Sequence, residues 1–401
     1  MQAENITPPP CSWAPPPPGP CSRRLINIPL KDIIRNFTPS WFSVTMGTGI
    51  LGTLLYTFPY QFSGLKYIAG AVFTANVILY IVFSAITYTR YLMFPEIIKL
   101  MLAHPQQSMF VGTIPMGLAT IVNSIILMIP SETYPWAPIL AWVLWWVDVA
   151  LTLASIFVVP FSMILVQTHS LQLMTAAWLL PVVPAIVAAA SGGLLAPNLG
   201  PQQAVVTILV SYVLWGVGVS LAAIILSIYF QRLIVHRLPP AEVIVSVFLP
   251  LGPLGQGSYG IMKLGMASKQ IFPHFFPQIP LLGDIFEGVG IFVGLLMWGF
   301  ALWWTILAVY SIFNYSFIKK TLPFNMGWWG FTFPIGTYTS ATITLATLFD
   351  SAFFRVLGST YTVLLLLLWG LVLCRTVAGT WSGKLISAPC LNSAFRAANG
   401  K

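Results

Sequence analysis

Charged residues are scarce in this chain, and their scarcity excludes the soluble classes of protein. Only 7% of the 401 residues are charged, 57% are apolar, and the mean hydropathy is +0.86. Soluble globular domains carry about a quarter of their residues as charges. The composition therefore predicts an integral membrane protein.

Residues that bind metals or perform covalent chemistry are also few. The four cysteines form no CxxC pair, and the four histidines lie far apart in predicted loops. No paired carboxylates and no Ser/His set occur at one predicted depth, so zinc, disulfide and hydrolytic sites are excluded. The net charge of +9 is spread singly along the chain rather than in a stripe, which excludes a nucleic-acid partner. We expect a protein that is not an enzyme and has no metal site and no cofactor.

Long apolar runs are abundant instead. A bilayer core about 30 Å thick needs about 20 apolar residues per helix. Runs of that kind predict ten membrane spans, at 40-58, 65-90, 111-130, 136-167, 177-193, 202-230, 245-268, 282-309, 326-349 and 353-378. We expect an all-α membrane protein with a ten-helix transporter domain at 31-378. A proline-rich, disordered cytoplasmic tail at 1-30 precedes it, and a cytoplasmic C-terminal tail at 379-401 follows.

The distribution of lysine and arginine predicts the orientation. With the N-terminus in the cytoplasm, 14 of the 18 basic residues fall on the inner side, which leaves Lys66, Lys263, Lys269 and Arg355 on or toward the outer side. This bias follows the positive-inside rule. An even number of spans then returns the C-terminus to the cytoplasm.

Helix-breaking residues recur in alternate spans. Gly47, Pro115, Pro184, Pro253 and Pro334 follow one another at intervals of 68, 69, 69 and 81 residues. Broken helices in a membrane belong where protein or a water-filled cavity surrounds them. The spacing predicts five helical hairpins, each with a kinked first helix and a smoother second one, around a central pore. The alternative is that the prolines are ordinary kinks.

Polar groups near these breaks are suited to a small anion. The candidate donors that line the pore are Thr48, Thr113, Thr120, Asn123, Gln256, Ser258 and Thr337. Helix breaks expose backbone N–H groups, which favour anions, whereas a metal cation would need carboxylates. Apart from Lys263, no charge lies deep in an odd span, and Asp148 lies on an even one. Asp148 is interpreted as a structural hydrogen-bonding group or a proton-coupling site, and Lys263 as a residue that reaches the interface or attracts anions to the exit.

Several motifs, in order along the ten spans, resemble a known family. They are "GTGILG", "GTIPMGLATIVN", "LPVVPAIVAAASGG", "LPLGPLGQGSYG", "GWWGFTFPIGT" and "FRVLGSTY". Over residues 35 to 378 the chain is similar to the tellurite-resistance/dicarboxylate transporter family, which includes plant slow anion channels, and most similar to its fungal sulfite efflux branch.

The resemblance implies a homotrimer in membrane lipid, with one pore in each protomer and a phenylalanine gate on the ninth span. That position corresponds to Phe333, next to Pro334. The expected function is export of sulfite or hydrogensulfite across the plasma membrane, by a channel or a carrier. A malate or C4-dicarboxylate permease and a broader anion channel are the alternatives within the family. No arginine occurs in an odd span, which favours a compact anion over a dicarboxylate.

Overall fold

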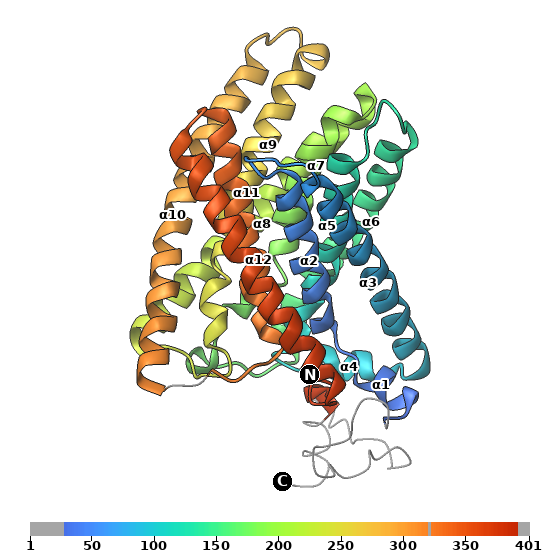
Figure 1. Ribbon diagram of the computed structural model, residues 1–401, viewed down its shortest axis with the longest axis vertical. Coiled ribbons are helices and arrows are strands. Elements are labelled where there is room, and N and C mark those ends of the chain that lie inside the picture. Colours follow the sequence, from blue (N-terminus) through green and yellow to red (C-terminus); the bar gives the residue numbers. More distant parts are fainter. Residues whose placement is uncertain (1–27, 320–321, 392–401) are drawn as a thin grey trace.

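The computed structural model describes residues 28–319 and 322–391, and within them every regular element is a helix. Each of the ten predicted ranges overlaps one α-helix, and six of these helices extend beyond the predicted bounds. These helices are α2 (Phe42–Tyr56), α3 (Leu65–Met93), α5 (Thr113–Met128), α6 (Trp136–Leu165), α7 (Val183–Leu195), α8 (Pro201–His236), α9 (Leu251–Phe275), α10 (Leu282–Lys319), α11 (Trp329–Leu348) and α12 (Ala352–Trp381). They run side by side along the long axis of the molecule (Figure 1). Two short helices, α1 (Leu30–Asn36) and α4 (Glu96–Ala103), lie together at one end.

Six of the described helices are long and apolar enough to cross a membrane. They are α3, α5 with the turn before it, α6, α8, α10 and α12. The other four, α2, α7, α9 and α11, are shorter or richer in glycine and hydroxyl side chains. The structure is that of a multi-pass membrane protein, and ten crossings stay a prediction.

Burial separates the helices into two groups. In the apolar window of α3 only 11% of residues are buried, against 67% in that of α5. Helices α2, α7, α9 and α11 are also mostly buried. Contacts run from α2 to α5, α7, α9 and α11 and back to α2, so these five helices form a closed ring. Each ring helix also contacts the helix that follows it, which places α3, α6, α8, α10 and α12 outside the ring.

A short 3₁₀ turn comes before every ring helix. The turns are η2 (Pro39–Trp41), η3 (Ser108–Gly112), η5 (Ala176–Leu179), η7 (Ile244–Phe248) and η8 (Met326–Trp328). They contact one another in the same cyclic order as the helices they precede. All five ring helices therefore begin at one end of the ring, here named the amino end. The opposite end is named the carboxyl end.

The position of the turns changes the interpretation of the prolines. Pro115, Pro184 and Pro253 lie in the first turn of their α-helices, after a 3₁₀ turn, rather than at a kink in the middle. A proline there removes no helical hydrogen bond, because the first N–H groups of a helix have no partner inside it. Only Pro334 lies further in, as an interior residue of α11. For three of the five ring helices the regularly spaced residue thus marks the first turn of the α-helix.

Two glycines allow α11 to pack closely against its neighbours in the ring. A Cβ on Gly47 of α2 would lie 2.2 Å from the Oγ1 of Thr332. A Cβ on Gly255 of α9 would lie 2.6 Å from the backbone N of Tyr338. Both distances are too short for any side chain, so α11 closes the ring only because these two positions are glycine.

The chain after α12 folds back over the amino end. Gly383 has a φ of 72°, which favours glycine and reverses the chain. The backbone N–H of Ala388 donates to Oδ1 of Asn36 at 3.2 Å, and Ala388 and Cys390 pack with residues of α4. This segment belongs to the range expected to be a C-terminal tail. The expected tail at 1-30 lies almost wholly outside the described residues.

Candidate functional site

Two cavities lie at the two ends of the ring. The amino-end cavity has a volume of about 360 Å³ and is lined by residues such as Met46, Leu249 and Gly330. The carboxyl-end cavity, of about 180 Å³, is lined by all five ring helices, and its residues are Ile50, Thr53, Thr57, Asn123, Leu127, Leu194, Gln256, Tyr259, Lys263, Ser340, Ile343, Thr344 and Thr347. The two cavities share no lining residue.

A layer of buried residues separates the cavities. On α2, Met46 lines one cavity and Ile50 the other, so only one helical turn lies between them. On α11, Gly330 lines the amino-end cavity and Ser340 the carboxyl-end cavity, so nearly three helical turns lie between them there. Phe333 belongs to this middle part of α11, is 3% exposed and lines neither cavity. The predicted gate residue therefore lies on the stretch of α11 between Gly330 and Ser340, which line the two cavities.

Three of the predicted pore hydroxyls bond to the outer helices. Thr48 Oγ1 accepts from Nε1 of Trp369 on α12 at 3.1 Å. Thr120 Oγ1 accepts from Nδ2 of Asn76 on α3 at 3.2 Å. Ser258 donates to the carbonyl of Gly294 on α10 at 2.6 Å. Since their hydrogen bonds point away from the ring axis, these hydroxyls join the ring to the surrounding helices.

The hydroxyls of two further predicted residues donate to backbone carbonyls of the protein, and three predicted prolines are buried. Thr113 donates to the carbonyl oxygens of Pro39 and Phe110, at 3.0 and 2.7 Å. Thr337 donates to the carbonyl of Pro334 at 2.8 Å. Pro115 and Pro184 are buried in α5 and α7. Pro253 lines a third, apolar hollow of about 420 Å³ between α8, α9 and α10.

Three predicted residues do come together, in the carboxyl-end cavity. Asn123 of α5 and Gln256 and Lys263 of α9 line it. Within the described part of the chain, none of these three side chains forms a hydrogen bond or an ion pair. The Lys263 Nζ lies 5.7 Å from the ring centroid of Tyr259, within the range of a cation–π contact. The cavity thus holds one cation and two amides whose donors are unused, and no carboxylate lines it.

Asp148 lies outside the ring. It is on the buried face of α6 with Trp145 and Thr152, is 1% exposed, and lines neither cavity. In the residues that the structure describes, its Oδ1 has no hydrogen-bond partner. Across 28–319 and 322–391, no three His, Cys, Asp or Glu side chains converge as a metal site requires.

The amino-end cavity contains residues that the sequence analysis did not single out. The Nδ1 of His104 accepts from the backbone N–H groups of Gln106 and Gln107, both at 3.2 Å, and both glutamines line the cavity. Burial lowers the pKa of His104, which agrees with its role as a neutral acceptor. Lys384, from the segment after α12, and Glu242 also line this cavity. No sequence pattern indicated these positions, because they come from separate loops.

Comparison with known proteins gives consistent similarities. Residues 36–377 match the SLAC1 family, described as voltage-dependent anion channels. The chain is 48% identical to the sulfite efflux pump SSU1 of Arthroderma benhamiae over 345 residues, an alignment that covers 86% of this chain and 91% of the relative. The sulfite efflux pump SSU1 of Trichophyton rubrum matches with the same identity and coverage. It is 23% identical over 347 residues to the malic acid transport protein of Schizosaccharomyces pombe, with 86% and 79% of the two chains covered.

Proposed function

Because the chain belongs to the SLAC1 family of voltage-dependent anion channels, we propose that it exports sulfite or hydrogensulfite across the plasma membrane. The observation that carries the proposal is the five-helix ring with a cavity at each end and one buried layer between them. A ring of this kind becomes a pore when the layer opens. Sulfite efflux pumps 48% identical to the chain support sulfite as the substrate.

The proposed orientation places the amino end of the ring in the cytoplasm, with both termini. Arg90, Arg232, Arg375 and Lys384 lie toward that end, on or after the outer helices, as the positive-inside rule requires. An anion that leaves a cytoplasm of negative potential gains about 2.3 kcal/mol per charge per 100 mV. Export through the ring is therefore downhill without a coupling ion.

The proposed gate is Phe333, held by Pro334. Its ring is buried in the layer between the cavities, where an apolar side chain excludes water and so denies an anion its hydration. Pro334 lies inside α11 and frees a backbone carbonyl at this depth, so the helix can bend beside the gate. We further propose that three protomers assemble in the lipid bilayer, each with its own pore.

A malate or C4-dicarboxylate permease is the second candidate. The malic acid transport protein, at 23% identity, is the observation that favours it. Two carboxylates separated by a carbon chain are best held by two fixed cations, whereas Lys263 is the one charged residue that lines the carboxyl-end cavity. The lining therefore fits a single compact anion better.

Flux into liposomes distinguishes these candidates. Purified protein in vesicles is given labelled sulfite, malate, nitrate or chloride on one side, with protein-free vesicles as the control. We expect sulfite to move faster than malate and to leave chemically unchanged. Malate flux above sulfite flux would support the dicarboxylate permease, equal flux of all four would support a broad anion channel, and no flux would contradict the proposal.

A further inference from the structure

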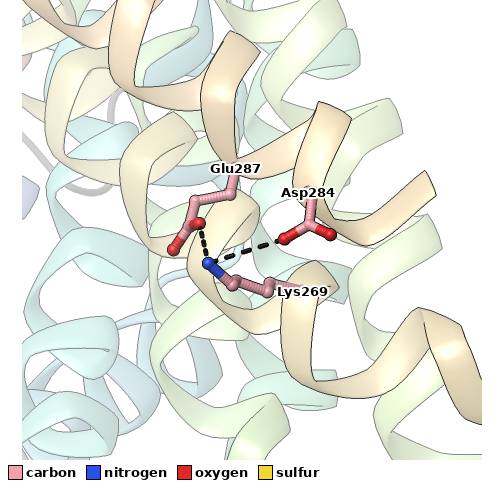
Figure 2. Close-up of polar contacts among 3 residues, drawn as sticks. All are labelled: Lys269, Asp284 and Glu287. Atoms are coloured by element: carbon pink, nitrogen blue, oxygen red, sulfur yellow. Dashed lines mark hydrogen bonds and ion pairs between the residues drawn. The ribbon is translucent and has the colours of Figure 1, made fainter. Parts of the chain in front are cut away.

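Two lysines on α9 lie in opposite electrostatic surroundings. Lys269 Nζ is 2.5 Å from Oε2 of Glu287 and 3.5 Å from Oδ1 of Asp284, both on α10 (Figure 2). Lys263, less than two turns earlier, lines the carboxyl-end cavity. Among the described residues no carboxylate lies within ion-pair distance of its Nζ. The charge of Lys269 is balanced by its neighbours, and that of Lys263 is not.

Some hydrogen-bond donors around Lys263 have an acceptor in the protein, and others have none among the described residues. The hydroxyls of Ser340 and Thr344 donate to backbone carbonyls of their own helix, at 3.1 and 2.9 Å. The side-chain amides of Asn123 and Gln256 have no hydrogen-bond partner within the described residues. Buried or half-buried donors are normally paired. In the part of the chain that the structure describes, the Oδ1 of Asn123 is buried without a hydrogen bond and can only accept, so the N–H groups of the two amides and of Lys263 are the donors in this cavity that an acceptor from outside the protein can use.

The chemistry of that acceptor follows from the lining. No carboxylate faces the cavity, so a metal cation would find no suitable ligand. A volume of about 180 Å³ admits a compact ion with part of its hydration water rather than a large organic anion. Charge-assisted hydrogen bonds from an ammonium and from amides are the usual means of binding an oxyanion.

We propose that the carboxyl-end cavity is an oxyanion-binding site built on Lys263, Asn123 and Gln256. The site takes compact oxyanions such as sulfite and sulfate. On the orientation of the proposed function, on which this step rests, the cavity opens to the outer solution. External oxyanions then occupy the site and slow the exit of sulfite.

The first test measures binding without transport. Formaldehyde and a borane reductant methylate the lysines of the purified protein. One sample contains sulfate and the other contains gluconate at equal ionic strength. The rate of methylation at each lysine is measured by peptide mass spectrometry. We expect sulfate to slow modification of Lys263 in a saturable manner and to leave Lys269 unaffected, because only Lys263 lies in the cavity. Replacing Asn123→Leu removes one hydrogen bond to a charged group and should raise the half-protecting sulfate concentration about tenfold.

The contradicting outcomes are distinct. Equal slowing at both lysines would be a general effect of sulfate on lysine modification, unrelated to the cavity, and would overturn the site. Unchanged modification of Lys263 in sulfate, or no modification of Lys263 by a reagent as small as formaldehyde, would overturn it as well. None of these results depends on flux.

The second test uses liposomes in which the wild-type protein exports sulfite. We expect external sulfate to inhibit this efflux, Lys263→Gln to weaken the inhibition about tenfold, and Lys269→Gln to leave it unchanged. Inhibition of the same strength in Lys263→Gln would overturn the site while the export function stands. Absence of sulfite flux in the wild type would instead contradict the proposed function, and the methylation assay would still decide whether the site exists.

Discussion

The ring helices and the helices around them are both apolar, yet they pack by different rules. The outer helices expose large side chains such as Tyr67, Phe292 and Leu367 to the surroundings. The ring helices are buried and use small residues and hydroxyls, so that positions such as Gly47 and Gly255 are in close contact with a neighbouring helix. Lipid is as apolar as leucine, so close packing of small residues, rather than hydrophobicity, holds membrane helices together. The difference distinguishes the helices that protein encloses from those that expose large apolar side chains at the surface.

The largest expected effect comes from enlarging a glycine in the ring. Gly47→Val would place a side chain 2.2 Å from the Oγ1 of Thr332, whereas Gly299 on α10 has nothing within 4 Å of its Cβ position. Overpacking costs typically about 1–3 kcal/mol, and more where backbones must separate. We expect Gly47→Val to lose most of its folded protein in size-exclusion and thermal-unfolding measurements, and Gly299→Val to match the wild type. Equal losses in both variants would mean that the two groups of helices do not pack differently.

A second effect tests the layer between the cavities. Phe331 and Phe333 are both buried on α11, but Phe331 packs on Phe248 with ring centroids 4.8 Å apart. Loss of a core phenylalanine costs about 3–5 kcal/mol. We expect Phe331→Ala to reduce stability and flux together. Phe333→Ala should give folded protein with several times the sulfite flux and weaker selectivity, because loss of the proposed gate side chain widens the layer between the two cavities.

The measurement for this pair is sulfite flux per folded protomer, with folded protein quantified on the same samples. A folded Phe333→Ala protein with unchanged or reduced flux would remove Phe333 from the gate. Raised flux in both variants would mean that any loosening of α11 opens the layer.

A smaller effect is expected at Asp148, which lies on an outer helix but faces inward. The side chain is buried and lines neither cavity, and Asp148→Asn preserves its shape, removes its ability to ionise and replaces one carboxyl oxygen by an NH₂ group. We expect sulfite flux within about twofold of the wild type, a change of less than about 0.5 kcal/mol in barrier height, at every pH between 5 and 8. Loss of the pH dependence of flux in this variant would assign Asp148 to proton coupling.

The smallest expected effect concerns His104, at the amino end of the ring. Burial holds its pKa below the usual 6.5, so the folded state binds this proton less readily than the unfolded state. Its contribution to stability is complete above pH 6.5 and is lost as the pH falls below that value, because the unfolded chain is protonated first. We expect the thermal midpoint to fall less between pH 7 and pH 5.5 in His104→Gln than in the wild type. An identical fall in both proteins would contradict the role of a neutral His104.

The sequence predicted the helices more accurately than the residues of the site. All ten predicted ranges overlap a helix, although α8, α9 and α10 extend at least six residues beyond their ranges because their last turns carry polar residues that end an apolar window. Three predicted pore residues, Asn123, Gln256 and Lys263, meet in one cavity. Thr48, Thr120 and Ser258 were equally plausible by residue type, yet their hydroxyls bond to outer helices. The residue type of a hydroxyl does not tell whether it faces the ring axis or an outer helix.

The sequence by itself determined the class, the helices and the alternation of two kinds of helix, because bilayer thickness and helix-breaking residues act locally along the chain. Tertiary structure alone decided that Pro115, Pro184 and Pro253 lie at the starts of ring helices while Pro334 lies inside α11, since the 3₁₀ turns that precede the ring helices contact one another around the ring. It also decided that Lys263 is unpaired while Lys269 is neutralised. Both lysines are single basic residues on one helix. They differ because Asp284 and Glu287 of α10 lie within ion-pair distance of Lys269.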